Sequence, residues 1–223
     1  MAPPAAAAIV AFGDSITDGA TSTPNTDRSW PSVLAQRLAA NPATANIAVV
    51  NQGISGNQVL ADGAGVSALA RFDRDVLSVA GARWVMIMEG INDIGIGSRQ
   101  GAPAGAISAD ALIGGLRQMI ERAHTHGIRV IGCTLTPYGG AGYASEAGEV
   151  IREAENNFIR TSGAFDAVVD FDMATHDPAN PKQFLAGYNL TDHLHPNDAG
   201  YKAMADSIDL SIFAEKATLK KKR

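Results

Sequence analysis

Short, continuous apolar runs alternate along this chain with longer stretches in which apolar residues recur at helical spacing. Continuous apolar runs are typical of strands that are covered on both faces of a sheet. Such runs predict five strands, over residues 9–12, 47–50, 84–88, 130–135 and 167–171. The chain is therefore expected to build one sheet that is buried between two layers of helices.

The stretches between the predicted strands have the amphipathic pattern of helices that pack on a core. They predict helices over residues 30–40, 66–79, 109–126, 146–161 and 197–213, and Gly127 is placed to end the third of these. Alternation of strands and helices indicates right-handed βαβ units. We therefore predict an α/β fold, a three-layer α/β/α sandwich around a five-stranded parallel sheet of the flavodoxin type.

Composition fits a single globular domain. The 223 residues are 46% apolar and 18% charged, with a mean hydropathy near zero. The predicted domain spans residues 9–214, between an N-terminal stub of residues 1–8 and a basic C-terminal tail of residues 215–223. No apolar run approaches the roughly 20 residues of a membrane-spanning helix, so we expect a soluble protein without a membrane partner.

The net charge argues against one class of partner, and the single cysteine argues against a disulfide-stabilised fold. A charge of −5 and a pI near 5.5 argue against a nucleic-acid-binding surface. Cys133 alone excludes an internal disulfide and lies within an apolar run, where a small buried side chain is expected. The Ala/Pro-rich start is not an intact signal peptide, but it fits what remains after a targeting segment or upstream domain is removed. Localisation therefore stays open, secretion included.

A tight turn follows the first predicted strand, and it carries Ser15 between Gly13 and Gly19. A serine on a strand-to-helix turn has an exposed hydroxyl and nearby backbone N–H groups, which suits a nucleophile. The same turn suits a phosphate-binding loop. It also fits a structural turn in which Asp14, Ser15 and Thr17 cap the next helix.

Polar and glycine-rich segments follow other predicted strands, at the edge of a parallel sheet where ligands gather. They are residues 51–56 after the second strand, residues 90–93 after the third and residues 191–196 before the last helix. From these segments His195 could act as general base, with Asp192 holding its ring in one tautomer. Ser15, Gly53 and Asn92 could donate N–H groups to an oxyanion.

Each of these segments also has a purely structural interpretation. Residues 51–56 could form an ordinary turn, Asn92 and Asp93 could cap a helix, and Asp192 could cap the final helix. His193 has the wrong offset to share the geometry of His195, so it is interpreted as a residue of the rim. The coincidence of four such segments at one edge of one sheet favours an active site.

Taken together, these motifs resemble the GDSL, or SGNH, hydrolase superfamily. The matching blocks are Gly13-Asp14-Ser15, Asn51-x-Gly53-x-x-Gly56, Gly90-x-Asn92-Asp93 and Asp192-x-x-His195-Pro196, in the order of the family. Ile16 replaces the leucine that gives the family its name. The residues around the blocks are similar to bacterial and fungal arylesterases and acetyl xylan esterase-like members.

The resemblance implies that Ser15 is the nucleophile of a catalytic triad with Asp192 and His195, and that Gly53 and Asn92 are oxyanion donors. It implies a serine esterase that needs no metal or organic cofactor. We expect a small-molecule or saccharide ester as substrate, with a short acyl group, since the loops are rich in Gly and Ala. The alternatives are a non-catalytic or nucleotide-binding flavodoxin-like module and a metal-dependent deacetylase. The oligomeric state is left open.

Overall fold

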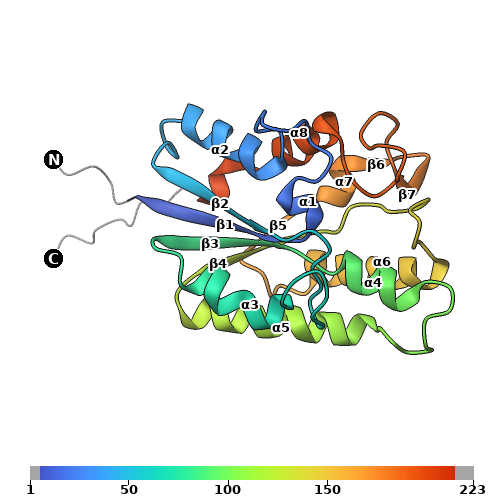
Figure 1. The fold of residues 1–223 in the computed structure, drawn as a ribbon. Helices are drawn as coiled ribbons and strands as arrows, with labels where there is room; N and C mark the ends of the chain where they lie inside the picture. The colour runs from blue at the N-terminus through green and yellow to red at the C-terminus, as the bar shows by residue number, and fades with distance from the viewer. Residues whose placement is uncertain (1–5, 214–223) are drawn as a thin grey trace, which may run out of the picture.

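The computed structural model describes residues 6–213, and a parallel five-stranded sheet forms its centre (Figure 1). The strand order is β2-β1-β3-β4-β5, which is the order of a flavodoxin-like sheet. The strands are β1 (Ala7–Gly13), β2 (Ile47–Gly53), β3 (Ala82–Met88), β4 (Arg129–Cys133) and β5 (Ala167–Val169). The predicted fold class is confirmed.

Helices cover both faces of the sheet, so the molecule has three layers (Figure 1). On one side lie α1 (Ser15–Asp18), α2 (Trp30–Ala40), α7 (Phe171–Thr175) and α8 (Asp198–Asp206). On the other side lie α3 (Ala68–Phe72), α4 (Ile91–Ser98), α5 (Ala109–Thr125) and α6 (Glu146–Thr161). Shorter elements complete the fold: a π-helical turn η1 (Asp73–Leu77), a hairpin of β6 (His176–Asp177) and β7 (Asn180–Phe184), and η2 (Leu210–Phe213).

Several boundaries match the sequence pattern, and one domain boundary does not. The helices over 30–40 and 146–161 have the predicted ends, and Gly127, at φ 70°, follows α5 as expected. β1 starts at Ala7, which pairs with Ile47, so residues 7 and 8 belong to the sheet and not to the predicted N-terminal stub. Residues 1–5 of that stub and the predicted basic tail lie outside the described residues.

The fold also contains helices that the sequence pattern did not predict. The pattern predicts no helix directly after the third strand, but α4 spans Ile91–Ser98. Gly95 and Gly97 lie in this helix, and Tyr143 and Ile107 pack against them so closely that an added Cβ would be 2.3 Å and 2.7 Å away. Tertiary packing therefore overrides the low helix propensity of glycine in this segment.

The fifth strand and the last helix are shorter than predicted. β5 stops at Val169 because Asp170 caps α7 by accepting a hydrogen bond from the N–H of Met173. The helix predicted over 66–79 begins at Ala68 and widens into the π-helical turn η1. The last predicted helix breaks after Asp206 and resumes as η2. Strands and helices are thus correctly ordered, with ends that local capping decides.

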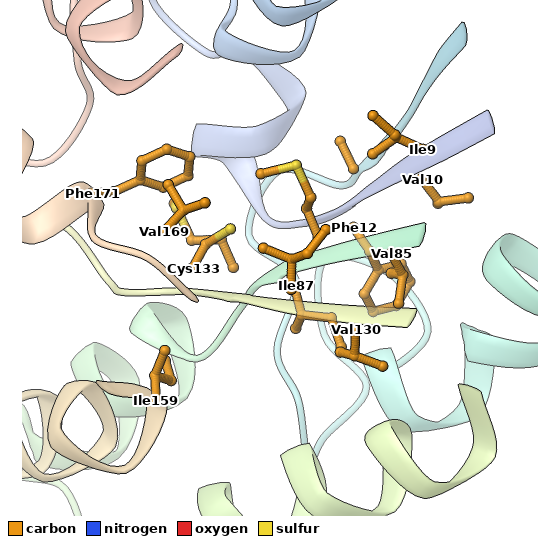
Figure 2. Packing of buried hydrophobic residues seen from close by; sticks show 14 of the residues in the cluster. Ile9, Val10, Phe12, Val85, Ile87, Val130, Cys133, Ile159, Val169 and Phe171 are labelled. Atoms are coloured by element: carbon orange, nitrogen blue, oxygen red, sulfur yellow. The ribbon is translucent and has the colours of Figure 1, made fainter. Parts of the chain in front are cut away.

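Buried apolar side chains fill both interfaces between the sheet and the helices (Figure 2). Phe12 of β1 meets Phe72 of α3 edge to face, with ring centroids 5.4 Å apart. Cys133 is fully buried in this core, as predicted, and burial raises the pKa of its thiol. This packing holds the carboxyl ends of the strands rigidly at one edge, where the candidate site lies.

Within residues 6–213, no helix combines the length and apolar character that a membrane crossing requires.

Candidate active site

The turn after β1 presents Ser15 at the start of a short helix. Asp14 caps α1 by accepting a hydrogen bond of 2.9 Å from the N–H of Ile16. Gly13 must be glycine here, because an added Cβ would lie 2.3 Å from both the carbonyl oxygen of Met88 and the hydroxyl of Thr17. The Ser15 N–H has no partner among the described residues, so the turn offers both a hydroxyl and a backbone donor.

Ser15 and His195 are 180 residues apart in the chain, but they are hydrogen-bonded in the structure. The Oγ of Ser15 lies 2.8 Å from Nε2 of His195, and Nδ1 of the same ring lies 2.7 Å from Oδ2 of Asp192. The tertiary fold thus brings together the three residues that the sequence suggested as nucleophile, base and orienting carboxylate. Their contacts have the nucleophile–base–carboxylate order of a triad.

Backbone N–H groups fix the orientation of Asp192. Its Oδ1 accepts hydrogen bonds from the N–H groups of Leu194 and His195, which leaves Oδ2 for the imidazole. Partial burial acts to raise the pKa of Asp192, but the hydrogen bonds from the His195 ring and from these N–H groups hold it below the ordinary value. At neutral pH the carboxylate is therefore ionised, and its Oδ2 faces Nδ1 of His195.

Asn92 lies in the first turn of α4 with its amide held on both sides. Nδ2 donates to the carbonyl oxygen of Asn57 at 3.0 Å, and Oδ1 accepts from the hydroxyl of Tyr143 at 3.3 Å. An amide nitrogen carries two hydrogens, so one N–H of Asn92 is left over. That N–H can donate to an oxyanion, in keeping with the role that the sequence suggested.

Gly53, the other suggested oxyanion donor, has a different role in the structure. Its N–H donates to Oδ1 of Asn51 at 2.9 Å and is therefore already engaged. An added Cβ at Gly53 would lie 2.1 Å from the backbone nitrogen of Asp18, so glycine is needed for β2 to approach α1. Glycine at residue 53 therefore serves close packing of β2 on α1, and its N–H is not free for an oxyanion.

Gly56 is a better candidate in the same motif. Its φ is 78°, which favours glycine, and its N–H has no partner among the described residues. The next residue, Asn57, touches the Asn92 amide through its carbonyl oxygen. Asn57 itself is held by Nε of Arg71 at 2.8 Å. The motif Asn51-x-Gly53-x-x-Gly56 contained this glycine, but spacing alone could not show which N–H was free.

Four carboxyl groups are buried beneath the site. Asp14, Glu89, Asp93 and Glu155 are each at most 4% exposed, and both oxygens of Glu155 lack a hydrogen-bond partner in the structure. Burial is the main cause that raises the pKa of each, and repulsion among the carboxylates adds to the rise for Asp14, Glu89 and Glu155. Oε2 of Glu89 lies 3.5 Å from a guanidinium nitrogen of the buried Arg71.

The protonation of Asp14 predicts a pH-dependent gain in stability from Asp14→Asn. Burial, with repulsion from Asp93, raises the pKa of Asp14 to about 7, although the Ile16 N–H and Arg71 oppose this. A raised folded-state pKa means that the stability contributed by this carboxyl is complete below its unfolded pKa of about 4 and lost as pH rises through 7. The amide that replaces the carboxyl in this variant does not titrate. Each pKa unit is worth about 1.4 kcal/mol, so we expect Asp14→Asn to gain a few kcal/mol over wild type at pH 8 and almost none at pH 4.5.

Urea unfolding at both pH values measures this difference. Asp110→Asn, the same chemical change at an exposed carboxyl in the first turn of α5, outside this cluster, is the control. A gain that is equal at pH 4.5 and pH 8 would show that Asp14 is not protonated in the native protein.

Other aromatic and charged residues near this edge of the sheet have structural roles. Trp30 and Tyr138 are 0% and 1% exposed and belong to the core. His193 lies on the rim at φ 57°, a region that non-glycine residues rarely adopt, with its ring against Gly140. Asp93 accepts the N–H groups of Val59 and Leu60 and so shapes the loop after β2.

Two hollows flank the elements that carry these residues. One, of about 490 Å³, is lined mainly by polar side chains, among them Ser145, Glu146, Asn180, Lys182 and Gln183, and adjoins Gly140. The other, of about 620 Å³, lies beside α4 and has an apolar wall that includes Leu60, Ile96 and Ile107. Within residues 6–213, no group of three or more His, Cys, Asp and Glu side chains is arranged to hold a metal ion.

Comparison with known proteins gives a family match over most of the chain. The model of the GDSL-like lipase/acylhydrolase family matches residues 11–203. A search of curated proteins finds no match.

Solved structures with the same fold include a G-D-S-L family protein from Desulfitobacterium hafniense, at 27% identity and a TM-score of 0.68 over 90% of this chain and 96% of that one. An acetylxylan esterase from Geobacillus stearothermophilus aligns at 22% identity and a TM-score of 0.69, covering 92% and 93%. The acetyl xylan esterase AlAXEase aligns at 22% identity and 0.66, covering 90% and 96%.

Proposed function

Because the chain belongs to the GDSL-like lipase/acylhydrolase family, and its matched region contains the hydrogen-bonded Ser15, His195 and Asp192, we propose that it is a serine esterase that acts through an acyl-enzyme on Ser15. Membership of the family supports ester hydrolysis in general. The observation that carries the finer proposal is the pair of contacts of 2.8 Å and 2.7 Å that join hydroxyl, imidazole and carboxylate.

In the first step, Oγ of Ser15 forms a bond to the ester carbonyl carbon while its proton passes to Nε2 of His195. The carbonyl oxygen becomes an oxyanion, which accepts the Ser15 N–H and the remaining N–H of the Asn92 amide. We propose the N–H of Gly56, in place of that of Gly53, as a third donor. The alcohol then leaves with the proton from His195, and the acyl group stays on Ser15.

In the second step, water donates a proton to Nε2 of His195 and attacks the acyl carbon. The acid is released and Ser15 regains its proton from the imidazole. The ionised Asp192 stabilises the imidazolium that forms in each half-reaction. No residue needs to move between the steps, since the same nitrogen of His195 takes and returns the proton.

We propose a short acyl group, acetyl in the first instance, on a small-molecule or saccharide alcohol. The loops at the rim are rich in Gly and Ala, and two of the structural neighbours are acetyl xylan esterases by name. The polar side chains around the 490 Å³ hollow could hydrogen-bond the hydroxyl groups of such an alcohol.

Covalent labelling and a chain-length series test this proposal. A fluorophosphonate probe, followed by peptide mass spectrometry, is expected to label Ser15 and no other serine. With p-nitrophenyl esters, kcat/KM is expected to fall at least tenfold from acetate to octanoate, and acetylated xylan is then tested for acetate release. A label elsewhere would contradict the nucleophile. A maximum at hexanoate or longer would contradict the acetyl preference and favour an acyl chain in the apolar hollow beside α4.

A further inference from the structure

The loop between β4 and α6 carries a tyrosine to the candidate oxyanion site. The hydroxyl of Tyr143 donates to Oδ1 of Asn92 at 3.3 Å. Its ring lies against the backbone of Gly95, where an added Cβ would be 2.3 Å from ring carbons. Its other neighbour is the ring of Tyr138, with centroids 6.1 Å apart. Tyr143 is therefore held in one place by α4 and by its own loop.

Two consecutive backbone turns shape the loop that carries Tyr143. The N–H of Ala141 donates to the carbonyl oxygen of Tyr138, and the N–H of Ala144 donates to that of Ala141. Tyr143 lies within the second of these turns, and its ring is held between Gly95 and the ring of Tyr138. A side chain that is already ordered loses little entropy when it makes a hydrogen bond.

The Asn92 amide has two anchors, and each fixes a different atom. Its Nδ2 faces the carbonyl oxygen of Asn57, which can only accept, so the amide cannot be turned over without placing two acceptors together. Its Oδ1 faces the hydroxyl of Tyr143. With both atoms held, the plane of the amide and the direction of its second N–H are determined.

We propose that Tyr143 is a positioning residue, which aims the free N–H of Asn92 at the oxyanion by holding the other end of the amide. The inference rests on the proposed function. Preorganised donors stabilise the transition state because they need no reorientation when charge develops. Tyr143 acts through Asn92 and does not itself touch the reacting atoms.

The electrostatic surroundings of Tyr143 suit a permanent donor. Burial, with the nearby charges of Asp14, Tyr138 and Asp192, raises the pKa of its phenol well above the ordinary value. The hydroxyl therefore stays protonated at every pH at which the enzyme can work.

A double-mutant cycle tests whether Tyr143 acts through Asn92. The full chain is assayed with p-nitrophenyl acetate as wild type, Tyr143→Phe, Asn92→Ala and the double variant. Loss of one hydrogen bond of this length is expected to lower kcat about three- to tenfold with KM within twofold. Asn92→Ala alone is expected to lower kcat by about 10²–10³-fold. In the Asn92→Ala background, Tyr143→Phe is expected to change kcat less than twofold, because its partner is absent.

Tyr138→Phe is the matched control, because it removes a hydroxyl from the same loop that contacts the Ser145 carbonyl and not Asn92. It is expected to keep kcat within twofold. Thermal unfolding of each variant verifies the fold; if Tyr143→Phe unfolds below assay temperature, the cycle is run with Tyr143→Leu, which has no donor and is no larger than tyrosine.

The same cycle separates failure of the inference from failure of the proposed function. If Asn92→Ala loses activity as expected but Tyr143→Phe lowers kcat by the same factor in both backgrounds, the positioning role is wrong. An unchanged kcat for Tyr143→Phe has the same consequence. If Asn92→Ala itself retains wild-type turnover, the proposed oxyanion site is wrong. The positioning role of Tyr143 is then wrong as well.

Discussion

Ser15→Ala is expected to lower kcat for p-nitrophenyl acetate by about 10⁴–10⁶-fold, because the variant has no oxygen to form the acyl-enzyme. The N-cap contact between Asp14 and the Ile16 N–H does not involve the serine hydroxyl. Removing the hydroxyl therefore breaks only its contact with His195. The variant should keep the thermal stability of the wild type to within a few degrees. Stopped-flow assays should show that the burst of p-nitrophenol is absent.

The control for this prediction is Ser78→Ala, since the Ser78 hydroxyl contacts the Arg74 carbonyl at the end of η1, away from the site. Its turnover should match the wild type. A burst that persists in folded Ser15→Ala protein would mean that another group accepts the acyl chain, and the proposed mechanism would have to be abandoned.

Asp192→Asn is expected to lower kcat/KM by about 10³–10⁴-fold with little effect on the fold. The N–H groups of Leu194 and His195 both donate to Oδ1 of residue 192, so an oxygen must stay at that position. The amide nitrogen of the variant must therefore take the position of Oδ2. That nitrogen would donate to Nδ1 of His195, which then has to carry its proton on Nε2. An imidazole in this tautomer cannot accept the proton of Ser15. Steady-state kinetics between pH 6 and 9 measure the loss.

A second aspartate–histidine pair supplies the matched control. Oδ2 of Asp166 lies 2.9 Å from Nε2 of His124, on the surface between α5 and β5. Asp166→Asn makes the same chemical change and should leave kcat/KM within twofold of wild type. Activity within tenfold of wild type for Asp192→Asn would show that the carboxylate does not set the tautomer of His195.

The sequence predicted the order of strands and helices because hydrophobic period is a local property. The carboxyl ends of β1, β2 and β3 carry Ser15, the Gly53–Gly56 segment and Asn92, as the topology required. The sequence pattern missed α4, because Gly95 and Gly97 have low helix propensity and no local pattern shows that Tyr143 and Ile107 pack against them.

What the chain determines by itself is thus the sheet, its polar edge and the residue types gathered there. Which of these groups are hydrogen-bonded to one another, and which remain free for a ligand, only the tertiary structure decides. The N–H of Gly53 is occupied while that of Gly56 is not, and Tyr143 reaches Asn92 across 51 residues. Which groups form hydrogen bonds depends on the distances between segments that are remote in sequence. A local sequence pattern carries no information about those distances.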